Sequence, residues 1–229
     1  MVARFVSLLL LRHGQSEWNA VRRWQGLADS PLSDLGRRQA ADASVALAST
    51  GHRFQAVWSS PLVRAAETGD IIADHLGLGA VNVDERLSEA DAGEWEGMTP
   101  DEINVAYPGF LADHRRPHTF ERVEQVVERT TEALAAIAER STTDRAAVIV
   151  TTHSGVIRTL VRHLGWNDER VPNLGGVWVS VDTSATEVTR FDLRRRFDPT
   201  GVARTGVDAP GEDPGEQADE AEAHRDTQR

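Results

Sequence analysis

Runs of hydrophobic residues alternate with amphipathic stretches along most of the chain. Residues 5–11 are hydrophobic except for Ser7, and residues 54–60 and 147–151 form two further hydrophobic runs. Runs of this length are typical of strands that are buried on both faces, as in the parallel sheets of α/β proteins. Shorter strands are expected at residues 81–83, 177–181 and 186–193.

The stretches between these runs carry hydrophobic residues at helical spacing. Ser33 is a suitable N-cap for a helix that ends by Gly51, and Pro61 predicts the first position of a second helix. A long helix is expected over residues 121–140, and another is expected from Val156 onward. This order of strands and helices predicts an α/β fold, and a single core is the default for 229 residues.

Polar residues that suit an anion directly follow two of the strands. Arg12, His13 and Gly14 follow the first strand, where a guanidinium and an imidazole can face one anion and the glycine lets the backbone approach it. The strand at residues 147–151 leads into His-Ser-Gly at residues 153–155. Because ligands bind at the carboxyl ends of parallel strands, both sequences are candidates for one site. Taken alone, Arg-His-Gly is equally compatible with a solvated strand end.

A longer stretch is more specific. Residues 10–19 read LLRHGQSEWN, and Gln25-Gly26, Asp29, PLS at 31–33 and GRRQA at 36–40 follow. This pattern resembles the histidine phosphatase superfamily, the phosphoglycerate mutase-like proteins, and in particular its phosphatase branch. The resemblance covers residues 5 to about 193 and implies a three-layer α/β/α sandwich with a mostly parallel central sheet. We therefore expect a histidine phosphatase domain over residues 1–197.

The resemblance also implies roles for individual residues. His13 is the expected nucleophile, which forms a phosphohistidine. Glu89, in the sequence Leu-Ser-Glu, is the expected proton donor for the leaving oxygen. Arg12, Arg64 and His153 are expected to bind the phosphoryl oxygens, because guanidinium groups offer planar, forked donors.

Four further residues are expected to bind the substrate, whereas Glu96 is expected to have a structural role. The expected substrate-binding residues are Asn19, Gln25, Gly26 and Ser154. Glu96 matches the common Trp-Glu-Gly of the family, for which a structural role is expected.

These assignments predict a metal-independent phosphomonoester hydrolase, a phosphomonoesterase of the histidine acid phosphatase type. It would release inorganic phosphate from a small phosphorylated metabolite, with no cofactor, because the arginines and His153 neutralise the phosphoryl charge. Phosphoglycerate-mutase-type phosphoryl transfer and a non-catalytic module that binds a phosphorylated ligand are the alternatives. Hydrolysis is favoured because the substrate-clamping segments of bisphosphoglycerate-dependent mutases are absent between Gly97 and Glu121.

Composition narrows the chemistry and the partners. The chain has no cysteine and no lysine, which excludes a thiolate nucleophile and a lysine-containing phosphate loop. Its net charge of −11 argues against nucleic acid and anionic membranes as partners. No hydrophobic run reaches membrane-spanning length, so we expect a cytoplasmic protein. Whether it forms a homodimer is left open.

Residues 100–119 are the segment whose structure is hardest to predict, and in the phosphatases that the chain resembles this region covers the active site. His114 and His118 have the spacing of a metal-binding pair on a helix. Pro117 lies between them and would break such a helix, which favours exposed loop histidines near the mouth of the pocket.

Two features depart from the family pattern. Phe120 and Arg122 stand where many relatives have Gly and Ser, which favours a bulkier, more basic pocket mouth that suits an aromatic or doubly anionic substrate. Residues 198–229 are rich in Gly, Pro, Asp, Glu and Gln and carry a net charge of −6. This composition predicts an acidic, disordered C-terminal tail.

Overall fold

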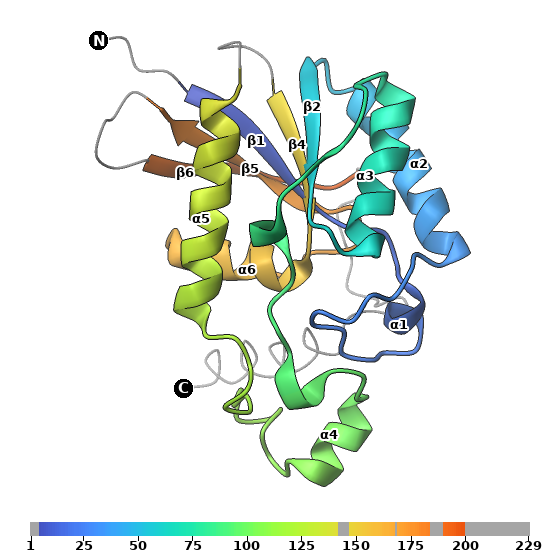
Figure 1. Cartoon of the computed structure of the whole chain (residues 1–229), viewed down its shortest axis with the longest axis vertical. Helices are drawn as coiled ribbons and strands as arrows, with labels where there is room; N and C mark the ends of the chain where they lie inside the picture. The colour runs from blue at the N-terminus through green and yellow to red at the C-terminus, as the bar shows by residue number, and fades with distance from the viewer. Residues whose placement is uncertain (1–4, 142–146, 168, 184–189, 200–229) are drawn as a thin grey trace, which may run out of the picture.

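A six-stranded sheet lies at the centre of the described part of the chain (Figure 1). The computed structural model describes residues 5–141, 147–167, 169–183 and 190–199. The strands are β1 (Phe5–Arg12), β2 (Phe54–Ser59), β3 (Asn82–Val83), β4 (Ala147–Thr152), β5 (Gly176–Asp182) and β6 (Arg190–Phe197). The predicted strand at residues 186–193 thus ends later than expected, at Phe197, and residues 184–189 lie outside the described residues.

The sheet is mostly parallel, which confirms the prediction. Its order is β3-β2-β4-β1-β5-β6, in which β3, β2, β4 and β1 are parallel to one another and β5 is antiparallel to both β1 and β6. β1 lies inside the sheet, where Leu8 pairs with Val148 on β4 and with Val179 on β5. A strand in this position is covered on both faces, which accounts for its run of leucines.

Two helices cover each face of the sheet (Figure 1). They are α2 (Asp34–Ala48) and α3 (Val63–Leu76) on one face, and α5 (Val123–Glu139) and α6 (Ser154–His163) on the other. Leu8 and Leu10 pack with residues of α5 and α6, whereas Leu9 and Leu11 pack with residues of α2 and α3. All four are fully buried, and each contributes about 2 kcal/mol to folding by leaving water. The predicted three-layer sandwich is therefore confirmed.

The first residue of each helix depends on which groups accept hydrogen bonds from the free amides of its first turn. Ser33 caps α2 as predicted, since its side chain accepts from an amide in the first turn. Pro61 is not the first residue of α3, which begins at Val63. Asp29 Oδ1 accepts from the Val63 amide at 2.6 Å, so a distant carboxylate caps this helix two residues later than predicted. α5 also begins two residues later than predicted, and α6 two residues earlier.

A separate aromatic cluster lies beyond the carboxyl ends of the strands. Trp24, Trp95 and Phe120 meet edge to face, with ring centroids 5.1–6.3 Å apart. The short elements nearby are α1 (Glu17–Ala20), the 3₁₀ turns η1 (Glu85–Leu87) and η2 (Gly93–Trp95), and α4 (Pro100–Ala106). The predicted elements do not include α4, although Thr99 and Glu102 form a capping box around it.

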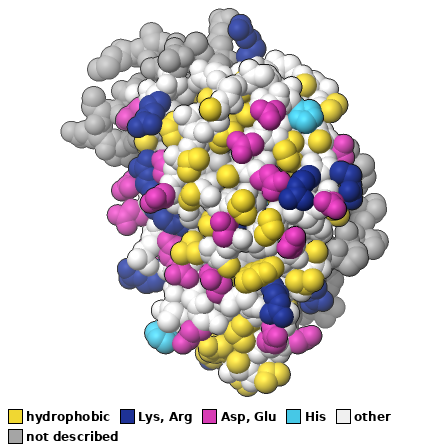
Figure 2. Space-filling view, turned by 45° about the vertical axis from the view of Figure 1, so that its right-hand side comes forward, with side chains coloured by type: hydrophobic (Ala, Val, Ile, Leu, Met, Phe, Trp, Pro, Cys, Tyr) yellow, Lys and Arg dark blue, Asp and Glu magenta, His cyan; other side chains and the backbone are white. Residues whose placement is uncertain are grey.

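The surface carries charges of both signs. Figure 2 shows acidic and basic side chains interspersed over one face, with hydrophobic side chains gathered at its lower end. Within the described ranges, no helix is both long and apolar enough to cross a membrane. Most of the predicted acidic tail, residues 200–229, lies outside the described residues.

Candidate active site

The carboxyl ends of β1 and β4 lie side by side, and a histidine directly follows each of them. The parallel pairing of Arg12 with Thr152 places the rings of His13 and His153 with their centroids 5.2 Å apart and their planes tilted by 60°. His13 is 3% exposed and His153 is fully buried. Two strand ends that are remote in sequence therefore form one buried imidazole pair.

His13 is held as a neutral ring. Its Nδ1 lies 2.6 Å from the carbonyl oxygen of Gly14, and because a carbonyl only accepts, Nδ1 carries the hydrogen and Nε2 keeps its lone pair. Burial lowers the pKa of His13 well below 6.5, and the positive charges of Arg64 and Arg12 lower it further. At neutral pH, Nε2 therefore carries a free lone pair and needs no deprotonation.

His153 is oriented by a hydroxyl group. The Ser60 Oγ lies 2.8 Å from its Nε2, while Nδ1 is buried without a hydrogen-bond partner among the described residues. Burial lowers the pKa of His153 well below 6.5, and the positive charges of Arg64, Arg129 and Arg12 act in the same direction. A buried ring nitrogen without a partner is costly unless a ligand meets it, so Nδ1 is a candidate ligand contact.

Both depressed histidine pKa values predict a loss of stability in acid. Below pH 6.5 the unfolded chain takes up a proton at each histidine while the folded chain does not, until the pH reaches the lowered folded pKa. The free energy of unfolding should therefore fall by about 1.4 kcal/mol per histidine per pH unit below this point. Urea titrations at pH 7.5 and 5.5 should show a smaller loss for His13→Asn than for the native chain. Equal losses would contradict the neutral state of His13.

Two buried arginines stand beside the imidazoles. Arg12 donates from Nη1 to the Val171 carbonyl at 2.7 Å. Arg64 donates from Nη1 and Nη2 to the carbonyls of Ala28 and Gly26 at 2.7 and 2.9 Å. Each arginine is at most 1% exposed. Two guanidinium groups fixed next to neutral rings make this a region that suits a phosphate dianion.

The loop that carries Gln25 and Gly26 is held from several sides. Glu96 Oε2 accepts from the amides of residues 27 and 28 at 3.0 and 3.1 Å, which agrees with the structural role predicted for Glu96. The Ser16 hydroxyl donates to Gln25 Oε1 at 2.7 Å. Gly26 has a φ of 53°, and a Cβ there would lie 2.7 Å from a backbone nitrogen, so only glycine fits.

Gly14 and Asn19 have structural contacts that the sequence did not indicate. The approach of Gly14 to an anion stays a prediction. Its amide donates to Thr68 Oγ1 at 3.0 Å, and a Cβ there would lie 2.5 Å from the Gly36 carbonyl oxygen, so the glycine also allows α2 to approach. Asn19 Oδ1 accepts from the Ser16 amide at 3.2 Å, whereas Nδ2 is buried without a hydrogen-bond partner among the described residues.

Glu89 comes from the segment between η1 and η2. Its Oε1 accepts from the Ala90 amide at 2.8 Å, and its Oε2 accepts from the Gly155 amide at 3.2 Å in the first turn of α6. A Cβ at Gly155 would lie 2.6 Å from Oε1. The glycine after Ser154 therefore leaves the space that the carboxyl group occupies.

A cavity of about 550 Å³, within the range of small-molecule sites, is lined by part of this set. Arg12, His13, Asn19 and His153 are buried and are not among the residues that line it. Its walls include the predicted residues Gln25, Gly26, Arg64, Glu89 and Ser154. The other charged or titratable residues of the wall are Arg116, His118, Glu121, Arg122, Glu124, Arg158 and Arg162. Five arginines thus face three glutamates, and the wall has a positive balance. His118 lies at the wall as expected, whereas His114 does not line it.

Three residues with evident roles escaped the sequence analysis. Ser60 orients His153, Thr68 accepts from Gly14, and Arg129 on α5 contacts the backbone beside Glu89. Ser60 could have been found, because it is the last residue of the predicted strand at residues 54–60 and so lies at the same edge of the sheet as the histidines. No local pattern marks Arg129. Among the described residues, no group of three or more His, Asp or Glu side chains could hold a metal ion.

A model of the histidine phosphatase superfamily (branch 1) matches residues 8–197, which include both histidine-bearing strand ends. The chain belongs to the histidine phosphatase superfamily. The match extends over the described sandwich from Leu8 within β1 to the end of β6.

Relatives within the histidine phosphatase superfamily include phosphatases and mutases. The glucosyl-3-phosphoglycerate phosphatase of Mycolicibacterium vanbaalenii is 36% identical in an alignment 190 residues long, which covers 76% of this chain and 83% of the relative. The structure of a mycobacterial glucosyl-3-phosphoglycerate phosphatase with VO3 has a TM-score of 0.66 at 30% identity, over 83% of this chain and 97% of that one. The 2,3-bisphosphoglycerate-dependent phosphoglycerate mutase of Parvibaculum lavamentivorans is 29% identical in an alignment 170 residues long, which covers 69% of this chain and 79% of the relative. The phosphatase matches support a phosphomonoesterase.

Proposed function

We propose that the chain hydrolyses phosphomonoesters through a phosphohistidine on Nε2 of His13, without a metal. The observation that carries this proposal is the pair of buried, neutral imidazoles 5.2 Å apart, next to the positive charges of Arg12 and Arg64. A neutral ring can attack phosphorus, and fixed cations can stabilise the charge on the equatorial oxygens. Membership of the histidine phosphatase superfamily supports the same chemistry.

The proposed reaction has two half-reactions. In the first, His13 Nε2 bonds to phosphorus as the bond from phosphorus to the ester oxygen breaks, and Glu89 gives its proton to that oxygen. In the second, Glu89 as a carboxylate takes a proton from water, and the water oxygen bonds to phosphorus as the phosphorus–nitrogen bond breaks. Inorganic phosphate is then released, and Glu89 is again protonated for the next cycle.

The other predicted site residues receive binding roles. Arg12, Arg64 and Nδ1 of His153 are assigned to the phosphoryl oxygens, because the charges of both arginines act on His13 and the ring of His153 lies 5.2 Å from that of His13. Asn19 is assigned to a phosphoryl oxygen through Nδ2, the buried amide group described above. The residues assigned to the rest of the substrate are Gln25, Gly26 and Ser154.

Two alternatives use the same site differently. A mutase would pass the phosphoryl group from His13 to a second hydroxyl group, and the similarity to a phosphoglycerate mutase favours testing this. A binding module would hold the ligand without chemistry. Incubating the native chain in EDTA with p-nitrophenyl phosphate and with phosphoglycerates separates the three. Release of inorganic phosphate supports hydrolysis, and transfer between hydroxyl groups indicates a mutase. If neither product forms, the binding module is the alternative that remains.

The proposal also concerns the substrate, which we infer to be a small phosphorylated metabolite that carries a second anionic group. Arg158 and Arg162 follow Ser154 at successive four-residue intervals, so they lie along one face of α6. At about 1.5 Å per residue, their Cα atoms lie about 6 and 12 Å beyond that of Ser154. A carboxylate or a second phosphate at this distance from the reacting phosphorus would meet these arginines and Arg122 across the cavity.

Exposed arginines of the cavity wall should therefore discriminate between substrates. Arg162→Gln and Arg122→Gln are expected to raise KM about tenfold for phosphomonoesters with a second anion, and less than about twofold for esters of uncharged alcohols. Arg38→Gln, on the exposed side of α2 and outside the cavity wall, is the matched control. Initial rates over a panel of both ester types measure the effect. Equal KM changes for the two types would contradict a second anion subsite.

A further inference from the structure

Arg129, on α5, uses all five of its N–H donors on protein acceptors. Nε and Nη2 donate to the two carboxylate oxygens of Glu121 at 2.7 and 2.9 Å. Nη1 donates to the carbonyl oxygens of Arg86 and Ser88 at 2.8 and 2.6 Å, and Nη2 also donates to the Glu89 carbonyl at 3.1 Å. A guanidinium has five donors, so none of them remains for a ligand.

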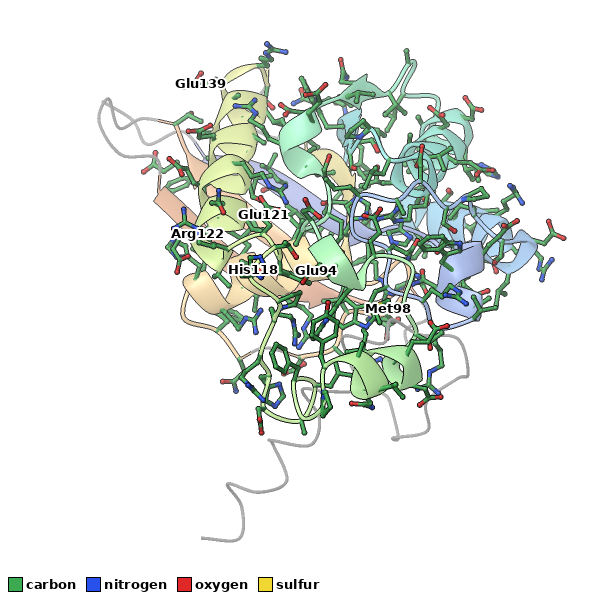
Figure 3. All side chains as sticks on the ribbon, turned by 60° about the horizontal axis from the view of Figure 1, so that its bottom comes forward. Glu94, Met98, His118, Glu121, Arg122 and Glu139 are labelled. Atoms are coloured by element: carbon green, nitrogen blue, oxygen red, sulfur yellow. The ribbon has the colours of Figure 1, made fainter. Side chains whose placement is uncertain are left out.

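Glu121 extends this clamp to the other side of Glu89. Its Oε2 accepts from the Asp91 amide at 3.2 Å, and its own amide donates to the Asp91 carbonyl at 2.9 Å. The side chains of Arg129 and Glu121 are only 20% and 17% exposed, so water competes little for these bonds. Figure 3 labels Glu121 at the start of α5 and Glu139 at the opposite end of that helix. The pair therefore ties residues 86–91 to the N-terminal half of α5.

The segment around Glu89 needs such support. Residues 88–92 lie between the single turns η1 and η2 and belong to no strand or helix. The Glu89 carboxyl group accepts from the amides of Ala90 and Gly155, and it would have to release or share these hydrogen bonds to move a proton. The position of its backbone is thus set by groups on α5.

We propose that Arg129 and Glu121 are positioning residues that hold the Glu89 backbone so that its carboxyl group meets the leaving oxygen. This inference rests on the proposed function, in which Glu89 is the proton donor. Neither residue is assigned a contact with the phosphoryl group. Because misplacing a reacting group by about 1 Å can cost about 100-fold in rate, loosening this clamp should slow proton transfer selectively.

The test compares two leaving groups, because only a poor one needs a proton. Arg129→Lys keeps the charge but has three donors in place of the planar fork. We expect it to lower kcat/KM for an alkyl phosphate about 100-fold, and to lower kcat/KM for p-nitrophenyl phosphate less than about fivefold. Glu121→Gln should show the same selectivity with a smaller loss. Arg140→Lys, at the C-terminal end of α5, is the matched control and should change neither rate.

Two outcomes would overturn the inference. One is an Arg129→Lys enzyme that keeps its native rate on the alkyl phosphate, and the other is an equal loss on both esters, which would indicate a general structural role. If Arg129→Lys does not fold by circular dichroism, Glu121→Gln decides by the same two criteria. Failure of the proposed function looks different, because the native chain would then hydrolyse neither ester, or Glu89→Gln would lack selectivity for leaving groups.

Discussion

Replacing His13 with asparagine is expected to lower kcat/KM for phosphomonoester hydrolysis by at least about 10⁴-fold, because loss of the nucleophile removes the covalent route altogether. Asparagine can still donate to the Gly14 carbonyl, which His13 contacts through Nδ1, so the fold should persist. Release of p-nitrophenol in EDTA measures the rate, and binding of inorganic phosphate shows whether the site survives.

His75→Asn is the matched control, since His75 is exposed on α3 and contacts only its own helix. It should hydrolyse the ester at the native rate. A His13→Asn protein that binds phosphate and retains more than about a hundredth of the native rate would exclude His13 as the nucleophile.

Glu89→Gln is the second large effect, and it should depend on the leaving group. Loss of a general acid costs about 10²–10⁴-fold where the departing oxygen needs a proton, so kcat/KM for alkyl phosphates should fall within that range. p-Nitrophenolate leaves without a proton, and its ester should lose much less in kcat/KM. The turnover number should still fall with both esters, because water attack on the phosphohistidine also needs the carboxylate.

Glu85→Gln is the matched control for this prediction. Glu85 is exposed, lies four residues before Glu89 and begins η1. Its variant should keep native rates on both kinds of ester. A Glu89→Gln enzyme that loses the same factor in kcat/KM on alkyl and p-nitrophenyl esters would show that Glu89 does not protonate the leaving group.

The strands of the sandwich could be predicted from sequence because burial on both faces leaves a pattern in consecutive residues. A strand buried on both faces must be apolar throughout, and the run before Arg12 shows this directly. His13 and His153 could be predicted to share one site because each follows such a run, and β1 and β4 are indeed neighbours in the sheet. The helix α4 also had a local signal in the capping box of Thr99 and Glu102, which the predicted elements leave out.

Other features depend on contacts between distant segments. The start of α3 is set by Asp29, which lies more than thirty residues earlier in the chain. The space for Glu89 is provided by Gly155, and its backbone is held by Arg129. The packing role of Gly14 was not predicted for the same reason, since the backbone that approaches it belongs to α2. No pattern along the chain encodes these pairings, because each depends on the packing of two layers.

The most direct test of the account asks whether phosphorus is carried by His13. The native chain and Glu89→Gln should be mixed rapidly with radiolabelled p-nitrophenyl phosphate, quenched in base and digested, and the labelled peptide should be sequenced. The account predicts an acid-labile, base-stable label on His13 that accumulates in Glu89→Gln and is absent from His13→Asn. A burst of p-nitrophenol with no label on the protein, or a label on any other residue, would contradict it.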